Sequence, residues 1–302
     1  MTHPSPTGRR ADSPRTSETI SKSAGTLAVA RNLAKIWALL IGFCAALGGL
    51  GWALGEYRLA SIFVFCGLLA AVTAWWHGER VALAMVGARK AADSEAPVVR
   101  AALERLARRA GVVVPRLYLI RDPFPRALST GRGVTASTVV LSTGLVASAS
   151  PAELEGVLAH EVAHVARRDV IVQTTAVLLA STLLELARLG GFLQRALLFV
   201  LGPVAAAFVH LLLSPKREFH ADRTAADLCE SPHGLADVLL RLDLAGELVG
   251  LDASPVTEPL HTVNPFPREQ PAQLFDTHPP VAERVRRLRA LDPAWRDKLQ
   301  AA

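Results

Sequence analysis

The sequence predicts an α+β, mainly helical protein with a small β-sheet and two to four transmembrane helices. Three observations lead to this fold class. Hydrophobic residues make up 51% of the 302 residues and gather in long apolar runs, as they do in membrane spans. Several other segments place apolar residues at helical spacing. Two short apolar stretches, with turn residues between them, predict β-strands.

Composition limits the classes of partner. Lys and Arg (33) exceed Asp and Glu (27), which gives a net charge of +6. Aromatic residues are only 6% of the chain, and no basic recognition helix stands out, so we expect no nucleic acid partner. Many arginines flank the apolar runs, as the positive-inside rule predicts for membrane proteins. The three cysteines show no CxxC spacing, so the sequence indicates neither a disulfide framework nor a thiolate zinc site.

The first 78 residues predict a tail followed by a membrane anchor. Residues 1–30 are rich in Ser, Thr, Pro and Arg and predict a disordered basic tail. Residues 31–78 predict a transmembrane hairpin, because runs 36–54 and 59–76 are each about 18–20 residues long. Lys and Arg lie before the first run and after the second. We therefore expect a multi-pass plasma-membrane protein whose N-terminus and later domain are cytoplasmic.

Residues 79–302 predict a single domain. Segment 80–110 has the pattern of an amphipathic helix. Segments 117–120 and 138–141 predict short strands, with turn-rich residues 121–135 between them.

A helix start follows the strands. Ser150 is a capping residue, Pro151 takes the first helical position and Glu153 completes a capping box. The pattern predicts a helix that continues to residue 167.

A hydrophobic hairpin at about 170–213 interrupts this domain. Its apolar runs, 170–184 and 196–213, could enter and leave the membrane from the cytoplasm. A buried helix pair within the soluble domain is the alternative. A Pro-rich loop is expected at 252–276. Further helices are expected at 215–229, 234–249 and 279–291.

The sequence His160-Glu161-Val162-Ala163-His164 lies within the capped helix. A spacing of four residues puts both imidazoles on one face, where they can occupy two corners of a tetrahedral zinc site. Glu161 can reach a zinc-bound water and act as the general base. Solvated histidines are the alternative, but the apolar residues around the motif argue against it.

A catalytic zinc needs a third protein ligand. Glu218 and Asp222 are again four residues apart and share a helix face. Glu218 can be the third ligand, and Asp222 can accept the second ring N–H of a zinc-bound histidine. A solvated acidic face is the alternative. His220 lies two positions from both carboxylates and is expected to face away. The prediction is one Zn²⁺ per chain.

These residues resemble the HtpX-like membrane zinc endopeptidases, a family that includes the eukaryotic CAAX prenyl endopeptidases. The resemblance rests on Glu153-Leu154, the motif at 160–164, Asp169, residues 217–222, Thr277-His278-Pro279-Pro280 and Glu283-Arg284. It implies a zincin-like metalloprotease domain with added membrane helices. It also implies that His278 contacts the substrate carbonyl or oxyanion and that Arg284 supports that region. Without the resemblance, His278 would be read as part of a turn and Arg284 as a solvated charge.

The chain departs from the family at one segment. Members commonly carry an Asn-Ala-Phe-like stretch before the strand that lies along the substrate. The matching segment here is 126–132, in which Ala127 and Gly131 fit while Arg126 and Leu128 do not.

The expected function is hydrolysis of peptide bonds by a zinc-dependent membrane endopeptidase. A substrate strand is expected to pair with an edge strand at Val139, Val140 and Leu141. The resemblance implies misfolded membrane polypeptides as substrates, in quality control at the lipid bilayer. Alternatives are a CAAX-type processing protease, a non-catalytic zinc-binding membrane scaffold, and a transporter or receptor. The sequence predicts no particular oligomeric state.

Overall fold

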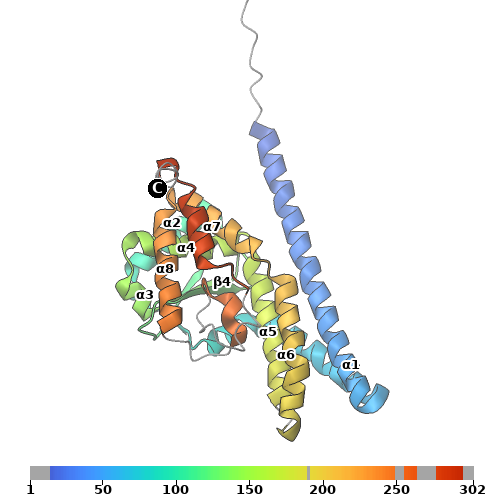
Figure 1. Cartoon of the computed structure of the whole chain (residues 1–302). Coiled ribbons are helices and arrows are strands. Elements are labelled where there is room, and N and C mark those ends of the chain that lie inside the picture. The colour runs from blue at the N-terminus through green and yellow to red at the C-terminus, as the bar shows by residue number, and fades with distance from the viewer. Residues whose placement is uncertain (1–13, 189–190, 249–254, 264–276, 295–302) are drawn as a thin grey trace, which may run out of the picture.

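The computed structural model describes residues 14–188, 191–248, 255–263 and 277–294. It combines a domain built around a small sheet with two helical hairpins that project from it (Figure 1). The α+β, mainly helical class predicted from the sequence is confirmed.

The sheet has four strands in the order β1-β2-β4-β3. The strands are β1 (Arg89–Lys90), β2 (Arg116–Ile120), β3 (Ala127–Gly131) and β4 (Ser137–Ser142). β2 and β4 are parallel, and the other two pairs are antiparallel. The strands predicted at 117–120 and 138–141 are confirmed to within one residue at each end. β3 lies in the stretch that we predicted as turns.

Our prediction that Val139, Val140 and Leu141 lie on an edge strand is wrong. These residues form the middle of β4, which pairs with β2 on one side and β3 on the other. Their backbone hydrogen bonds are used within the sheet, so no substrate strand can add to β4. The strand at the sheet edge is β3.

Helix α4 is the centre of the domain. It runs from Pro151 to Ala166 and starts at the predicted capping box of Ser150 and Glu153. It packs against the sheet and against α2, α7 and α8. Helices α4 and α8 approach closely at Gly156, where an added Cβ would lie 2.4 Å from the Leu235 nitrogen. This close packing holds α4, the helix that carries His160 and His164, in place.

Three of the surrounding helices, α7, α8 and α9, match the segments predicted at 215–229, 234–249 and 279–291 closely, whereas α3 was not predicted. The bounds of the surrounding helices are α2 (Pro97–Ala110), α3 (Thr143–Ser148), α7 (Lys216–Cys229), α8 (His233–Leu248) and α9 (Val281–Arg289). The helix predicted over 80–110 is two elements, because α1 ends at Met85 and β1 intervenes. Of the Pro-rich loop, residues 255–260 form a 3-10 helix, η2 (Pro255–Leu260). Segments 249–254 and 264–276 lie outside the described residues.

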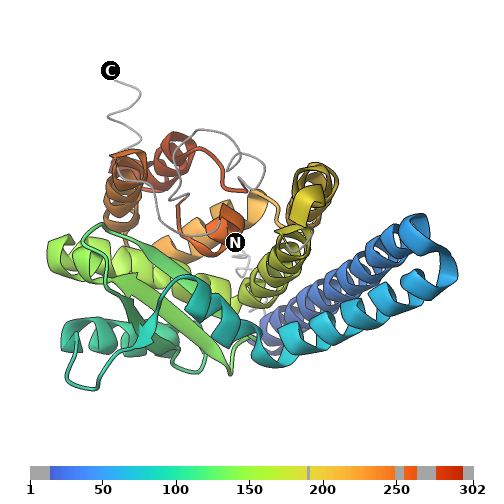
Figure 2. The same ribbon diagram turned by 90° about the horizontal axis from the view of Figure 1, so that it is seen from below.

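Helix α1 (Pro14–Met85) turns back on itself at Gly55 and Glu56, where the backbone leaves helical angles. Its halves run antiparallel as a hairpin (Figure 2). They are in close contact, since a Cβ at Gly48 would lie 2.9 Å from Val64. Residues 14–30 are helical, which corrects the predicted disordered tail; residues 1–13 lie outside the described part.

A second hairpin follows α4. It consists of α5 (Asp169–Arg188), the short η1 (Gly191–Leu193) and α6 (Gln194–Leu212). α5 packs along α1, where a Cβ at Gly78 would lie 2.6 Å from Leu178. The predicted hydrophobic hairpin is therefore present as a helical element.

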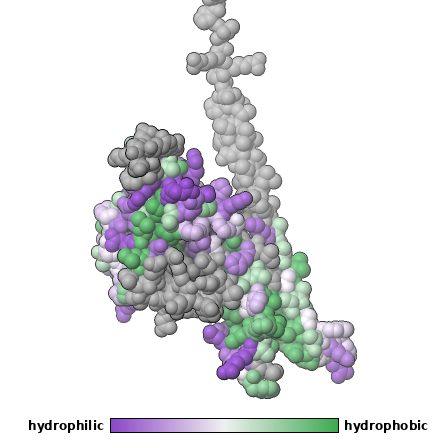
Figure 3. Space-filling view, in the orientation of Figure 1, coloured by the Kyte–Doolittle hydropathy of each residue, from purple (hydrophilic) through white to green (hydrophobic). Residues whose placement is uncertain are grey.

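The number of membrane helices differs from our prediction of two to four. Within the described residues, one helical element, Ala34–Thr73, is long and apolar enough to cross a membrane. The apolar part of α6, Gln194–Ala207, is shorter, and α5 is largely buried against its neighbours. In the view of Figure 3, apolar surface gathers on the lower part of the molecule, where the hairpins project, with hydrophilic groups on either side of it. Within the second hairpin, Phe192 of η1 is 96% exposed and Phe199 of α6 is 83% exposed.

Candidate metal centre

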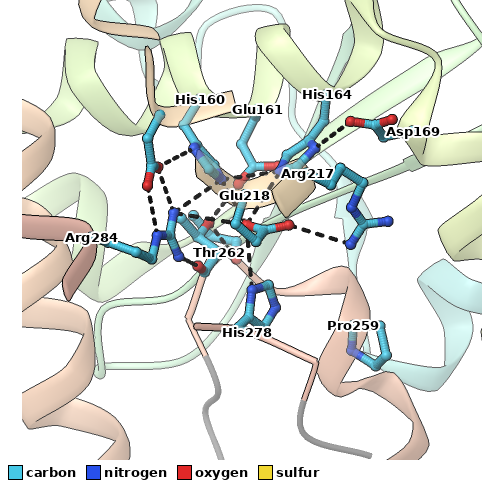
Figure 4. Close-up of polar contacts among 12 residues, drawn as sticks. His160, Glu161, His164, Asp169, Arg217, Glu218, Pro259, Thr262, His278 and Arg284 are labelled. Carbon is cyan, nitrogen blue, oxygen red and sulfur yellow. Dashed lines mark hydrogen bonds and ion pairs between the residues drawn. The ribbon is translucent and has the colours of Figure 1, made fainter. Parts of the chain in front are cut away.

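Two histidines of α4 face each other in the domain interior. The Nε2 atoms of His160 and His164 are 3.1 Å apart, and the rings are nearly perpendicular. Both side chains are buried. The spacing of four residues thus places both nitrogens at one point, as the sequence predicted (Figure 4).

Glu218 of α7 completes a cluster of three donors. Its Oε2 lies 3.5 Å from His160 Nε2 and 3.6 Å from His164 Nε2. The three candidate ligand atoms all lie within 4.8 Å of one another, which is close enough to hold one metal ion. Glu218 is fully buried, and its Oε2 accepts no hydrogen bond from the described residues. A buried acceptor beside two imidazole nitrogens fits a cation.

The outer nitrogen of each histidine faces a carboxylate. His160 Nδ1 lies 3.0 Å from Asp222 Oδ1, and His164 Nδ1 lies 3.3 Å from Asp169 Oδ2. A proton on each Nδ1 leaves the Nε2 lone pairs free to bind a metal, which is the carboxylate–histidine arrangement of metal sites. The sequence predicted this for Asp222. Asp169 was named only among the residues that resemble the family, and no contact with a histidine was predicted for it.

Charges in the cluster shift several pKa values. Burial acts against it, but Glu218 and Asp169 raise the pKa of His164 from 6.5 to about 9 in the metal-free protein. Burial likewise opposes the lowering of the Glu218 pKa, which His164 and His278 nevertheless hold well below its usual range. The site therefore keeps the Glu218 carboxylate ionised and favours a positive charge next to it.

Arg284 of α9 is buried beside the cluster and is not the solvated charge that its sequence position alone indicated. It donates two hydrogen bonds to Asp222 and a third, 2.6 Å long, to the Thr262 carbonyl. Although Asp222 is buried, the guanidinium lowers its pKa to about 2. Arg284 thus keeps the carboxylate that faces His160 ionised.

Glu161 lies next to His160 and is 1% exposed. The Thr262 hydroxyl donates a hydrogen bond to Glu161 Oε1. His278 approaches from the opposite side, with its Nδ1 3.3 Å from Glu218 Oε2 (Figure 4). The structure therefore brings together the metal cluster, Glu161, Asp222, His278 and Arg284. His220 is exposed, as predicted.

The outer edge of β3 is covered by the chain itself. Leu128 pairs with His261 in an isolated antiparallel bridge, and the Thr262 N–H donates to the Ala127 carbonyl at 3.0 Å. The Gln173 side chain of α5 donates a hydrogen bond from Nε2 to the Pro259 carbonyl at 3.0 Å, just before this segment. No sequence signal points to Thr262, because a lone threonine in a Pro-rich stretch matches no motif.

The segment that departs from the family pattern forms β3. Arg126, just before the strand, is buried and forms an ion pair with Asp122. Its backbone N–H donates to Ser142 Oγ at 2.9 Å. Arg126 therefore anchors the start of β3, and Leu128, the bridge partner of His261, is buried.

Comparison with known proteins identifies the family of this chain. Residues 93–292 match the sequence profile of peptidase family M48. The chain belongs to this family. It is 35% identical over 278 residues to a "Protease HtpX homolog" of Pelotomaculum thermopropionicum, covering 86% of this chain and 99% of that protein. It is 34% identical over 279 residues to a "Protease HtpX homolog" of Syntrophobacter fumaroxidans, covering 86% and 96%. The predicted HtpX-like metalloprotease is confirmed.

One solved structure is more distantly similar to this M48 protein. The crystal structure of S. mikatae Ste24p aligns with a TM-score of 0.45 at 20% identity, covering 91% of this chain and 66% of that chain.

Proposed function

We propose that this M48 metalloprotease is a zinc-dependent membrane endopeptidase whose single Zn²⁺ is held by His160, His164 and Glu218. The convergence of their three donor atoms, with both outer histidine nitrogens facing carboxylates, carries this proposal. Two nitrogens and one oxygen are a typical ligand set of catalytic zinc, which keeps a fourth position open. Zinc, when bound, polarises a carbonyl and lowers the pKa of water.

Glu161 is the proposed general base. Its carboxylate lies beside the first histidine ligand, inside a site from which solvent is largely excluded. It takes a proton from the attacking water and then delivers that proton to the leaving amine. A purely structural metal site has no use for a carboxylate at this position, so the non-catalytic scaffold is disfavoured.

Three further residues support the site in different ways. Asp222 orients His160, and Arg284 acts through Asp222, so both are positioning residues. His278 lies on the far side of Glu218 from α4 (Figure 4). We assign it the contact with the substrate carbonyl oxygen, where an imidazole N–H stabilises negative charge that develops during attack.

The substrate is proposed to bind at the outer edge of β3. An extended peptide can add to an exposed sheet edge through main-chain hydrogen bonds, with little demand on its sequence. Here residues 261–262 occupy that edge, and Thr262 engages Glu161. We infer that the substrate strand replaces this segment as it binds. The hydrogen bond from Thr262 to Glu161 is then broken, and Glu161 becomes available as the base.

The antiparallel halves of α1 are proposed to anchor the chain in the plasma membrane. Because the chain returns to the side from which it entered, the N-terminus and the catalytic domain share the cytoplasmic side. Misfolded membrane polypeptides in quality control are the proposed substrates. The CAAX-type alternative requires a large chamber for a lipidated substrate between many spans, whereas the described residues contain one candidate membrane element.

Removal and return of the metal tests this proposal. The detergent-purified full chain is treated with a chelator, and cleavage of casein is then followed as Zn²⁺ is added back. Cleavage that is lost and then restored at one Zn²⁺ per chain supports the proposal. Full cleavage by metal-free protein would overturn it.

A further inference from the structure

A basic pocket lies near the end of α1, where residues of β2 and of the turn between β3 and β4 also line it. The cavity has a volume of about 710 Å³. Three arginines line it, each from a different part of the chain: Arg80 from α1, Arg116 from β2 and Arg132 from the β3–β4 turn. None of these residues takes part in the proposed proteolysis.

The charges in this pocket are unbalanced. Arg116 pairs with Glu79, which also accepts a hydrogen bond from the Thr138 hydroxyl. Within the described part of the chain, the guanidinium groups of Arg80 and Arg132 have no carboxylate partner, and both residues are exposed. Three guanidinium groups therefore face one carboxylate. Guanidinium groups bind phosphate through paired hydrogen bonds, so the pocket favours a phosphate-bearing ligand.

The pocket also lies at the height of a membrane surface. The apolar stretch of α1 ends at Thr73. At 1.5 Å per residue, Arg80 lies about 10 Å further along the helix, within the thickness of a headgroup layer. Trp76, between them, is 64% exposed. Tryptophan is enriched at this level, where its ring meets both lipid and water.

An apolar groove meets the basic pocket at Trp76. It has a volume of about 640 Å³ and lies between the two halves of α1. Ile36 and Leu40 line it from the first half, and Leu68 and Val72 line it from the second. Trp76 lines both the groove and the basic pocket. Together they form an amphipathic site with one charged and one apolar compartment.

We propose that this site binds one anionic phospholipid, with the phosphate headgroup among Arg80, Arg116 and Arg132 and an acyl chain in the groove. The apolar groove makes a lipid the occupant, because a free phosphate would leave it unused. The proposal rests on the membrane location inferred above and is independent of proteolysis. The bound lipid would join α1 to β2 and to the turn between β3 and β4, and so hold the catalytic domain at the membrane surface.

Native mass spectrometry of the detergent-purified full chain tests the site. The probes are phosphatidylglycerol, phosphatidylcholine with the same acyl chains, glycerophosphoglycerol without acyl chains, and inorganic phosphate. The test variant is Arg80→Gln/Arg132→Gln. The matched control, Arg108→Gln/Arg121→Gln, removes two exposed arginines outside the pocket.

We expect one phosphatidylglycerol per chain, bound in preference to phosphatidylcholine. The pocket variant should weaken its retention roughly tenfold, while the control variant retains it. Equal retention by the pocket variant and the wild type would overturn the proposal. So would binding of inorganic phosphate or of glycerophosphoglycerol as tight as that of the lipid, because the groove would then contribute nothing. Lipid retention is measured without any cleavage assay. A wild-type protein that retains the lipid but does not cleave casein would therefore contradict only the proposed protease function, not the lipid site.

Discussion

Arg284 holds Asp222 with two hydrogen bonds in the protein interior: Nη2 donates to Oδ1 at 2.7 Å, and Nε donates to Oδ2 at 2.9 Å. The third bond, from Nη1 to the Thr262 carbonyl, joins the same guanidinium to the segment on the edge of β3. One side chain of α9 thus links the orientation of His160 to the segment that occupies the proposed substrate position.

Replacement of Asp222 tests whether it orients a metal ligand. Asp222→Asn keeps the shape of the side chain but removes the charge that faces His160 Nδ1. Loss of such a partner lowers metal affinity roughly 10–100-fold, so we expect that range in a competition titration against a zinc chelator. Asp227→Asn, an exposed position on the same helix, is the control and should leave affinity unchanged. Equal affinities in the two variants would contradict the assignment.

Zinc affinity should depend on pH through His164. Its pKa in the metal-free protein is raised from 6.5 to about 9, so zinc must displace a proton below that pH. Apparent affinity should therefore rise about tenfold per pH unit between pH 7 and 8.5. Calorimetry in buffers of different ionisation enthalpy measures the released proton. Affinity that stays constant across this range would exclude a protonated His164.

The same shift affects the stability of the metal-free protein in the opposite direction. A raised folded-state pKa contributes stability that is fully present below pH 6.5 and is lost as the pH rises through about 9. Thermal unfolding of chelator-treated protein should therefore show this contribution declining over that interval, and His164→Gln should remove the decline.

A disulfide between β3 and its covering segment tests whether that segment must leave. Leu128 and His261 are antiparallel partners, a geometry that can accept a disulfide. In a background without the native cysteines, Leu128→Cys/His261→Cys should bind zinc but fail to cleave casein when oxidised. Cleavage should return on reduction. Each single cysteine variant is a control. An oxidised protein that cleaves at the reduced rate would show that the substrate binds elsewhere.

The path of α1 predicts which positions are accessible from each side of the membrane. In intact cells without the native cysteines, Glu56→Cys at the turn should react with a membrane-impermeant maleimide. Lys90→Cys on β1 should react only after the cells are permeabilised. Glu56 lies at the turn between the two halves, and Lys90 lies in the catalytic domain. The reverse pattern would refute the proposed orientation.

The sequence could predict the parts of this protein that depend on local spacing. His160 and His164 share a face because four residues make about one helical turn, and the Ser150 capping box fixes where that helix starts. Glu218 and Asp222 follow the same rule on α7. Each of these predictions needs only one helix, so no long-range contact had to be known.

Features that depend on tertiary contacts could not be predicted in this way. β3 contains Ser, Thr and Gly and is typical of a turn, yet pairing with β4 makes it a strand. The order of the strands was also not accessible, so β4 was wrongly placed at the edge. Thr262 reaches Glu161 across 101 residues, and Arg284 reaches Asp222 across 62. The apolar content of residues 170–213 predicts burial equally well in protein or in lipid.

Cleavage of casein by the Glu161→Gln variant, with bound zinc measured in the same samples, tests the central claim most directly. The substitution preserves size and leaves the three proposed ligands in place. We expect about one Zn²⁺ per chain in both proteins and a rate in the variant that is lower by roughly 10²–10⁴-fold, the usual contribution of a general base. A variant that binds zinc and cleaves at the wild-type rate would contradict the account.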